Sequence, residues 1–356
     1  MQTTRPNEFI ALIAVLTAMV AMSIDTMLPA VGTIATELHA ANPNDRQFIV
    51  LFFFLGLTFG QLIFGPMSDA SGRKPAIYSG LVIYAVGSLL CMFATNYPTM
   101  MAGRLLQGFG AAAPRVAAMA MVRDGSKGAD MARIMSFVMS VFMLVPILAP
   151  SIGQLVLYVA NWRYIFGGLL VAAAIASAWL YLRQPETLAP ENKRPISIAE
   201  LWAGAVEVFR NPVAMGYTLA SGFIFAAFTT YLGTSQQIFA EQYQQGDKFA
   251  LWFGGLAVAI AVAMIVNANL VRKIGMRMIS KQALRGFLVV WMCLLGFTAL
   301  YAGHPPLLIL GFFLLGSFFC SGLLFGNFNA IAMEPMGHVA GMAAAISGFE
   351  IGRAHV

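Results

Sequence analysis

Three charged side chains lie inside long apolar runs of this sequence, and they could take part in proton transfer. Asp25 lies in the run from residue 9 to residue 31, and Arg104 and Arg115 lie in the run from 98 to 122. Inside a membrane such a charge costs roughly 2.5–3.5 kcal/mol on insertion scales, so it needs a partner, a proton or water. The two arginines are eleven residues apart, about three helical turns, and therefore share one face of a helix.

Asp25 is the candidate for taking up and releasing protons. It is the one acid within the apolar runs, and an arginine stays charged, so Arg104 and Arg115 are its candidate partners. Burial favours the neutral carboxyl and a nearby arginine favours the ionised one, so its resting protonation stays open. Two structural alternatives also stay open: Asp25 only caps or hydrates a kink at Pro29, and Arg104 only binds backbone carbonyls.

The composition indicates a membrane protein. Of the 356 residues, 59% are hydrophobic and 10% are charged, and the mean hydropathy is +0.77. A soluble domain has more charge and could not bury so much apolar surface. We expect an all-α polytopic membrane protein with ten complete helices and the start of an eleventh near residue 341. The expected spans are 9–31, 47–66, 76–94, 98–122, 134–159, 163–183, 212–236, 249–271, 283–302 and 305–331.

The loops between these spans predict the orientation of the chain. Most arginines and lysines fall on one side, whereas Arg46, Arg163 and Lys248 fall on the other. The positive-inside rule therefore predicts a cytoplasmic N-terminus. The cysteines have no metal-ligand spacing, and we expect no metal, no cofactor and no nucleic-acid partner.

A glycine-rich charged loop follows the second span. It contains Gly65, Asp69, Gly72, Arg73 and Lys74 and resembles the signature loop of the major facilitator superfamily. Gly65 allows close backbone approach and Gly72 relaxes the turn, while Asp69 can pair with Arg73. The resemblance implies a cytoplasmic latch between two halves, with the eleventh helix as the partner of Asp69. The alternative is an ordinary polar loop.

The fourth span carries a second motif. Arg104, Gln107, Gly108 and Gly110 are similar to the intramembrane arginine motif of the same superfamily. The resemblance extends over most of the chain and implies two bundles of six helices in the full protein, with the binding site between them.

The fifth span carries a partial match to the glycine-proline motif of the superfamily's antiporters. Pro146, Pro150 and Gly153 stand at the matching positions, whereas Ala149 and Gln154 depart from the usual glycines. Two prolines four residues apart weaken the helix, and Gly153 permits close packing. A kinked helix without a transport-specific role explains the same residues.

The residues around Asp25 also carry a resemblance. The stretch Ser23–Ala30 is similar to the first-helix motif of the multidrug proton antiporters, and the fourth and fifth spans suggest the Bcr/CflA branch. This resemblance implies that Asp25, with Arg104 and Arg115, couples substrate movement to protons.

The span 212–236 offers a candidate substrate face. Tyr217, Ser221, Phe225, Phe228 and Tyr231 form a stripe roughly 120° wide at about 100° per residue. An aromatic wall suits a bulky, partly apolar ligand. Aromatic residues that face lipid or pack between helices would produce the same stripe.

We divide the chain into a first six-helix bundle (1–183), a cytoplasmic linker (184–211) with an amphipathic helix at 197–210, and an incomplete second bundle (212–349). Residues 350–356 interrupt the eleventh helix and, back-translated, reproduce the start of a common sequencing adapter. We interpret them as an artefact. We expect the complete protein to transport and the chain as written not to.

Together these features predict a monomeric, proton-coupled secondary transporter. It would export small drug-like or amphipathic molecules across the bacterial inner membrane by alternating access, with protons and the lipid bilayer as its other partners. An uptake symporter for a small metabolite and a transport-inactive sensor are the alternatives. No catalytic motif indicates an enzyme.

Overall fold

The computed structural model describes residues 6–126, 128–193, 206, 207 and 209–335, and their regular structure is helical. The long helices are α1 (Pro6–Asp25), α3 (Arg46–Ser71), α4 (Arg73–Met92), α5 (Tyr97–Gly125), α6 (Gly128–Val159), α7 (Arg163–Arg183), α9 (Pro212–Gln236), α10 (Phe249–Ile274), α11 (Met276–Leu300) and α12 (Leu307–Met333). The shorter elements are α2 (Val31–Glu37), the 3-10 turns η1 (Leu28–Ala30), η2 (Pro43–Asp45), η3 (Pro190–Asn192) and η5 (Gly246–Lys248), and the π-helical turn η4 (Gln237–Gln242).

The predicted all-α membrane architecture is confirmed. Within the described ranges, nine helical segments are long and apolar enough to cross a membrane. The 32-residue α6 has a shorter described apolar stretch, Leu144–Val159, because several of its side chains lie outside the described set. The amphipathic helix expected at 197–210 falls largely outside the described residues. So do the eleventh helix and residues 350–356.

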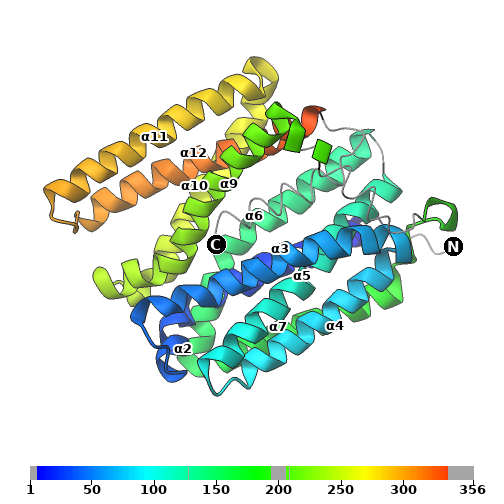
Figure 1. Ribbon diagram of the computed structural model, residues 1–356, viewed down its shortest axis with the longest axis horizontal. Helices are drawn as coiled ribbons and strands as arrows, with labels where there is room; N and C mark the ends of the chain where they lie inside the picture. Colours follow the sequence, from blue (N-terminus) through cyan, green and yellow to red (C-terminus); the bar gives the residue numbers. More distant parts are fainter. Residues whose placement is uncertain (1–5, 127, 194–205, 208, 336–356) are drawn as a thin grey trace.

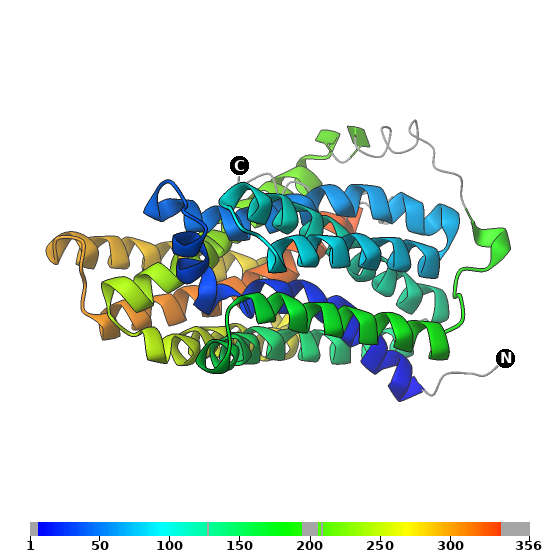
Figure 2. The same cartoon turned by 90° about the horizontal axis from the view of Figure 1, so that it is seen from below.

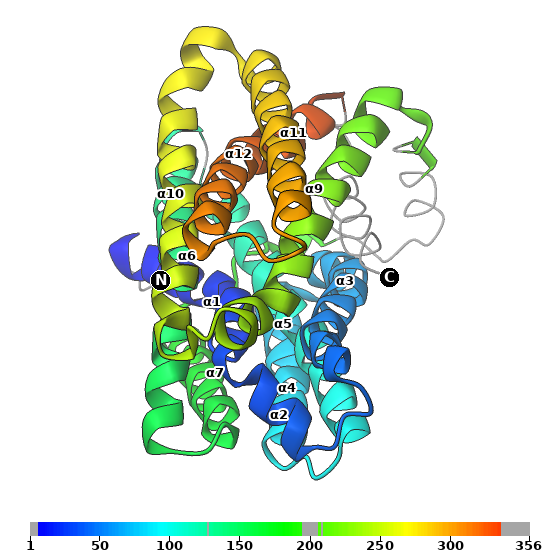
Figure 3. The same cartoon turned by 90° about the vertical axis from the view of Figure 1, so that its left-hand side faces the viewer.

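The helices form two groups. Helices α1 to α5 and α7 gather on one side and α9 to α12 on the other (Figures 1 and 3), and α11 and α4 lie towards opposite ends in the view from below (Figure 2). Helix α6 packs on α1 of the first group and on α10 of the second, and α3 contacts α9, so these contacts join the groups. The binding site expected between the two halves would lie at this boundary, next to these four helices and α1.

Small residues let the helices of the first group approach closely. A Cβ built at Gly108 of α5 would lie 1.9 Å from the Phe53 carbonyl oxygen of α3, and one built at Gly110 would lie 2.3 Å from the backbone nitrogen of Tyr84 on α4. Any larger side chain would force these backbones apart. Helix association in membranes relies on such close packing, because lipid offers no hydrophobic drive between helices.

The first span is broken, although a single helix over 9–31 was expected. Helix α1 ends at Asp25, and η1 and α2 carry the chain onward. Proline has no backbone N–H, so Pro29 cannot bond to the Asp25 carbonyl four residues earlier. The Met27 N–H instead bonds to the Ile24 carbonyl at 3.2 Å, in a tighter turn. The correction places Asp25 at a helix end.

The two groups are tied together at one end of the molecule. Arg46, at the start of α3, forms an ion pair with Glu241 of η4 and donates to Gln236 Oε1 at 3.3 Å. Beside this pair, Gln237 Nε2 lies 3.4 Å from Asn44 Oδ1. From this end α3 and α9 diverge (Figure 1). The tie lies opposite the basic loop that joins α3 to α4.

Candidate functional site

Asp25 is a buried acid at a junction of helices. Its side chain is 4% exposed, and no described residue forms a hydrogen bond or an ion pair with its carboxyl group. The Tyr231 hydroxyl of α9 lies within electrostatic reach of that carboxyl and is itself buried without a hydrogen bond among the described residues. Asp25 belongs to the first helix group and Tyr231 to the second. A proton or a ligand at this place would therefore act on both groups.

Helix α6 packs directly against the break that follows Asp25. A Cβ built at Gly153 would lie 1.9 Å from the carbonyl oxygen of Thr26. The same helix meets α10 at Ile147, before Gly153 in the chain, where a Cβ at Gly254 would lie 3.2 Å from the Ile147 carbonyl oxygen. Helix α6 continues through both Pro146 and Pro150. The antiporter-like motif is thus brought next to the Asp25 motif.

Arg104 does not pair with Asp25. Its guanidinium is fully buried and donates to the backbone carbonyls of Ile49, at 2.9 Å, and Ser23, at 3.2 Å, and to Oε1 of Gln107. The Phe53 ring centre lies 4.5 Å from the guanidinium carbon. The carbonyl-binding alternative therefore describes this side chain. Because the Ser23 carbonyl is two residues before Asp25, Arg104 holds the end of α1 in place.

A buried polar network extends from Arg104 to α4. Gln107 Nε2 donates to the Ser88 hydroxyl at 2.8 Å, and the Ser23 and Tyr84 hydroxyls are 2.7 Å apart. Buried polar groups rigidify a site when they are satisfied; here one donor, Arg104 Nη2, has no hydrogen-bond partner among the described residues. Together with the close contacts at Gly108 and Gly110, this network fixes α1 against α3, α4 and α5.

Arg115 lies in a different environment from Arg104. It is exposed on α5, and no described residue forms a hydrogen bond or an ion pair with it. The shared helix face that the spacing predicts therefore does not bring both cations to Asp25. Among the described residues, Asp25 has neither of its two candidate partners.

The aromatic stripe of α9 divides between two environments. Phe225 meets Phe54 of α3 edge to face, with the ring centres 5.9 Å apart, and so links the two helix groups. Tyr231 stacks on Phe253 of α10 at 5.8 Å. Tyr217 instead packs on α12 within the second group. All four aromatic residues of the stripe also contact rings of α12, which the sequence did not indicate: Tyr217 meets Phe328, Phe225 meets Phe325, Phe228 meets Phe318 and Phe325, and Tyr231 meets Phe318.

Ser221 follows Tyr217 on the same side of α9. Its hydroxyl is buried without a hydrogen bond among the described residues. Helix packing therefore describes the first part of the stripe. Phe225 contacts the first helix group through Phe54, Phe228 packs on Phe225, and Tyr231 interacts with the Asp25 charge.

The latch loop is built around Arg73. Gly72 has a φ of +117°, which suits glycine, and it turns the chain from α3 into α4. Arg73 pairs with Asp69, and its Nε donates to Asp124 at 2.8 Å. The Lys74 ammonium donates to the Gln184 carbonyl at 2.6 Å. The expected partner of Asp69, the eleventh helix, lies outside the described residues.

Gly65 was expected to allow close backbone approach. A Cβ at this position would meet nothing within 4 Å, so no backbone approaches it among the described residues. Among the described residues the close helix contacts of α3 fall at Gly56 and Gly60, which face α5, and the eleventh helix lies outside the described part of the chain.

The sequence of the chain decides its family. The sequence profile of the Major Facilitator Superfamily matches residues 12–354. The chain belongs to the Major Facilitator Superfamily. Its relatives are transporters and not enzymes.

Two relatives illustrate the match. The uncharacterized MFS-type transporter YdgK of Bacillus subtilis is 30% identical over 330 residues, which are 92% of this chain and 81% of YdgK. A bicyclomycin resistance protein homolog of Haemophilus influenzae is 28% identical over 341 residues, 96% of this chain and 85% of the relative. The xylose transporter XylE from E. coli, solved in a partially occluded inward-open conformation, shares the fold. Its TM-score is 0.72 at 14% identity, over 98% of this chain and 91% of XylE.

Two carboxylates of this superfamily member were not predicted as site residues. Asp124, at the end of α5, accepts from Arg73, and Glu186 accepts from the backbone N–H groups of Arg73 and Lys74 at 3.0 Å each. The sequence contains one signal that Asp124 could be a site residue, namely that this acid directly follows the basic Arg123. Glu186 has no such signal, because its partners are backbone groups.

Proposed function

We propose that the protein exports small drug-like or amphipathic molecules across the bacterial inner membrane in exchange for protons, with its N-terminus in the cytoplasm. One observation carries the proposal: Asp25 is a 4% exposed acid at the helix break, between α6 and α9, and no described residue pairs with it. An ionisable residue inside a membrane protein is functional by default. The relative named for bicyclomycin resistance supports export of a drug-like substrate.

In this mechanism Asp25 carries the exchanged proton. When substrate is absent the carboxyl holds a proton, and substrate binding releases it. The Tyr231 hydroxyl, which has no described hydrogen-bond partner, lies close enough to interact with the charge of the ionised carboxyl. Arg104 acts as a positioning residue, since its donors hold the Ser23 carbonyl and with it the end of α1. We assign Arg115, whose side chain is exposed on α5, to the path that leads protons or substrate to this site.

The contact between the two helix groups supports an inward-facing state. Arg46 and Glu241 join the groups at the end opposite the basic loop of Arg73 and Lys74. By the positive-inside rule that loop is cytoplasmic, so the tied end faces the periplasm. Alternating access then requires the Arg46 contacts to break while the groups rock about the central site.

Substrate would bind against the aromatic residues where the groups meet. Phe225, Phe228 and Tyr231 offer rigid ring faces within the same region as Asp25. Tyr217 and Ser221 act on substrate indirectly, by packing α9 against α12. The latch residues Gly65, Asp69, Gly72, Arg73 and Lys74 would stabilise one of the two end states through the carboxylates that surround Arg73.

Transport by reconstituted protein tests this function and its direction. The protein is placed in liposomes with an acidic interior, and accumulation of radiolabelled bicyclomycin and of the aromatic cation ethidium is followed. An antiporter accumulates substrate inside as protons leave, whereas an uptake symporter accumulates it only when the exterior is acidic. Accumulation with an acidic exterior alone would refute the exchange.

A further inference from the structure

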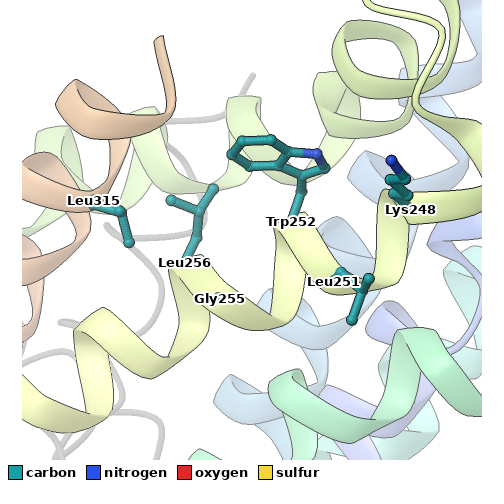
Figure 4. A pocket seen from close by; sticks show the side chains of 6 residues that line it. All are labelled: Lys248, Leu251, Trp252, Gly255, Leu256 and Leu315. Carbon is teal, nitrogen blue, oxygen red and sulfur yellow. The ribbon is translucent and has the colours of Figure 1, made fainter. Parts of the chain in front are cut away.

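An apolar groove runs along the outer face of the second helix group. It encloses about 400 Å³ and is lined by Lys248, Leu251, Trp252, Gly255, Leu256 and Leu315. Figure 4 shows Lys248 at one end of the row of side chains, Leu315 at the other and Trp252 between them. The groove faces away from the proposed site: Leu251 is 74% exposed, while Phe253, two residues along α10, is 3% exposed and stacks on Tyr231.

The wall of the groove is built by fixed contacts. The Trp252 ring stacks on Phe239 with centres 5.6 Å apart and an angle of 13° between the planes. A Cβ at Gly311 of α12 would lie 2.8 Å from the Trp252 ring, so this glycine admits the indole. At Gly255, by contrast, a Cβ would meet nothing within 4 Å. The space above Gly255 is therefore a feature of the folded chain that a side chain could fill.

The groove has the polarity and the depth of one membrane leaflet. Lys248 stands at the start of α10, and Leu256 lies eight residues later, which corresponds to about 12 Å along a helix. Half of a hydrocarbon core of about 30 Å is about 15 Å. No described residue pairs with the exposed Lys248 ammonium, and its charged neighbour in the chain is the exposed Asp247. The row thus runs from a cation at the interface to leucines at depth.

We propose that this groove is a binding site for a single anionic phospholipid from the leaflet on the side of the α9–α10 connection. One acyl chain lies over Gly255 between Trp252 and Leu315, and the phosphate meets the Lys248 ammonium beside the first N–H groups of α10. The apolar lining of the groove accounts for binding of the acyl chain, and the Lys248 ammonium selects a lipid whose headgroup is negatively charged. The site is independent of the direction of transport.

Quenching of tryptophan fluorescence by brominated lipid tests the proposal. The protein is reconstituted in phosphatidylcholine vesicles that contain increasing fractions of phosphatidylglycerol with brominated chains. We expect half-maximal quenching at a mole fraction about fivefold lower than with brominated phosphatidylcholine, the effect of one lysine near an anionic headgroup. The difference should disappear in Trp252→Phe, because Trp252 reports from the groove.

Two pairs of variants locate the site. Lys248→Gln removes the cation, and Lys273→Gln, at the other end of α10, is its control. Gly255→Leu fills the groove, and Gly296→Leu, which also meets open space, is its control on α11. We expect the lipid preference to be lost in Lys248→Gln and Gly255→Leu and kept in both controls. Equal quenching by the two lipids in the wild type would overturn the proposal, and so would a preference retained by Gly255→Leu or release of quenching by free inorganic phosphate.

Discussion

The contact between Gly153 and the Thr26 carbonyl gives a sharp test of how α6 supports the site. In Gly153→Ala the new Cβ would start 1.9 Å from that oxygen, whereas real Cβ atoms stay at least 3.0 Å away, so the two must separate by 1.1 Å. Overpacking of this kind costs about 1–3 kcal/mol. If the strain falls on one end state of the transport cycle, even about 1 kcal/mol shifts the ratio of the two states about fivefold. We expect slower substrate accumulation in liposomes and lower thermal stability in detergent.

Two control variants separate the causes. Gly168→Ala on α7 meets open space and receives the same gain in helix propensity, about 1 kcal/mol at most, so it should leave transport unchanged. Gly56→Ala creates an equal overlap, 2.0 Å from the Leu105 carbonyl oxygen, but away from the α1 break. It should lower stability while each folded molecule still transports. If Gly153→Ala leaves transport and thermal stability as unchanged as Gly168→Ala does, the reasoning is refuted.

Three further predictions follow from the polar contacts. Arg104→Lys loses donors to two buried carbonyls and should lower the free energy of unfolding by about 1–3 kcal/mol in detergent, whereas Arg115→Lys should change it little; equal effects would contradict the positioning role. Glu186→Gln removes a carboxylate from the start of α4 and should speed hydrogen exchange of its first amides, corresponding to about 0.3–1 kcal/mol; unchanged exchange would contradict this. A variant that carries Arg46→Cys and Glu241→Cys and lacks the three native cysteines should stop transporting when the two new cysteines are cross-linked, and transport should recover on reduction. Full transport while cross-linked would show that the contact between Arg46 and Glu241 does not have to open.

The membrane helices could be predicted from the sequence because the thickness of the bilayer demands long apolar runs. The sequence predicted one long first span and offered a kink at Pro29 only as an alternative, since hydropathy does not register the loss of one backbone donor. For the function of Asp25, the residue at which α1 ends matters more than the extent of the membrane span, because Asp25 lies at a junction of helices and not inside one helix.

The partners of the charged residues could not be predicted. The sequence predicts that Arg104 pairs with Asp25, because a carboxylate is the partner that a sequence identifies. The Arg104 side chain instead binds the backbone carbonyls of Ile49 and Ser23, and a sequence cannot single these out because every residue has a carbonyl. The aromatic stripe shows the same limit. Its spacing is regular and both Tyr217 and Phe225 pack on α12, yet only Phe225 also meets a ring of α3.

Asp25→Asn tests the central claim most directly. The amide keeps the size of the side chain and removes its exchangeable charge, so the variant should still exchange labelled bicyclomycin or ethidium across liposomes without a gradient. It should fail to accumulate either compound when the interior is acidic, while the wild type accumulates them. Gradient-driven accumulation by Asp25→Asn at the wild-type level would show that another group carries the proton.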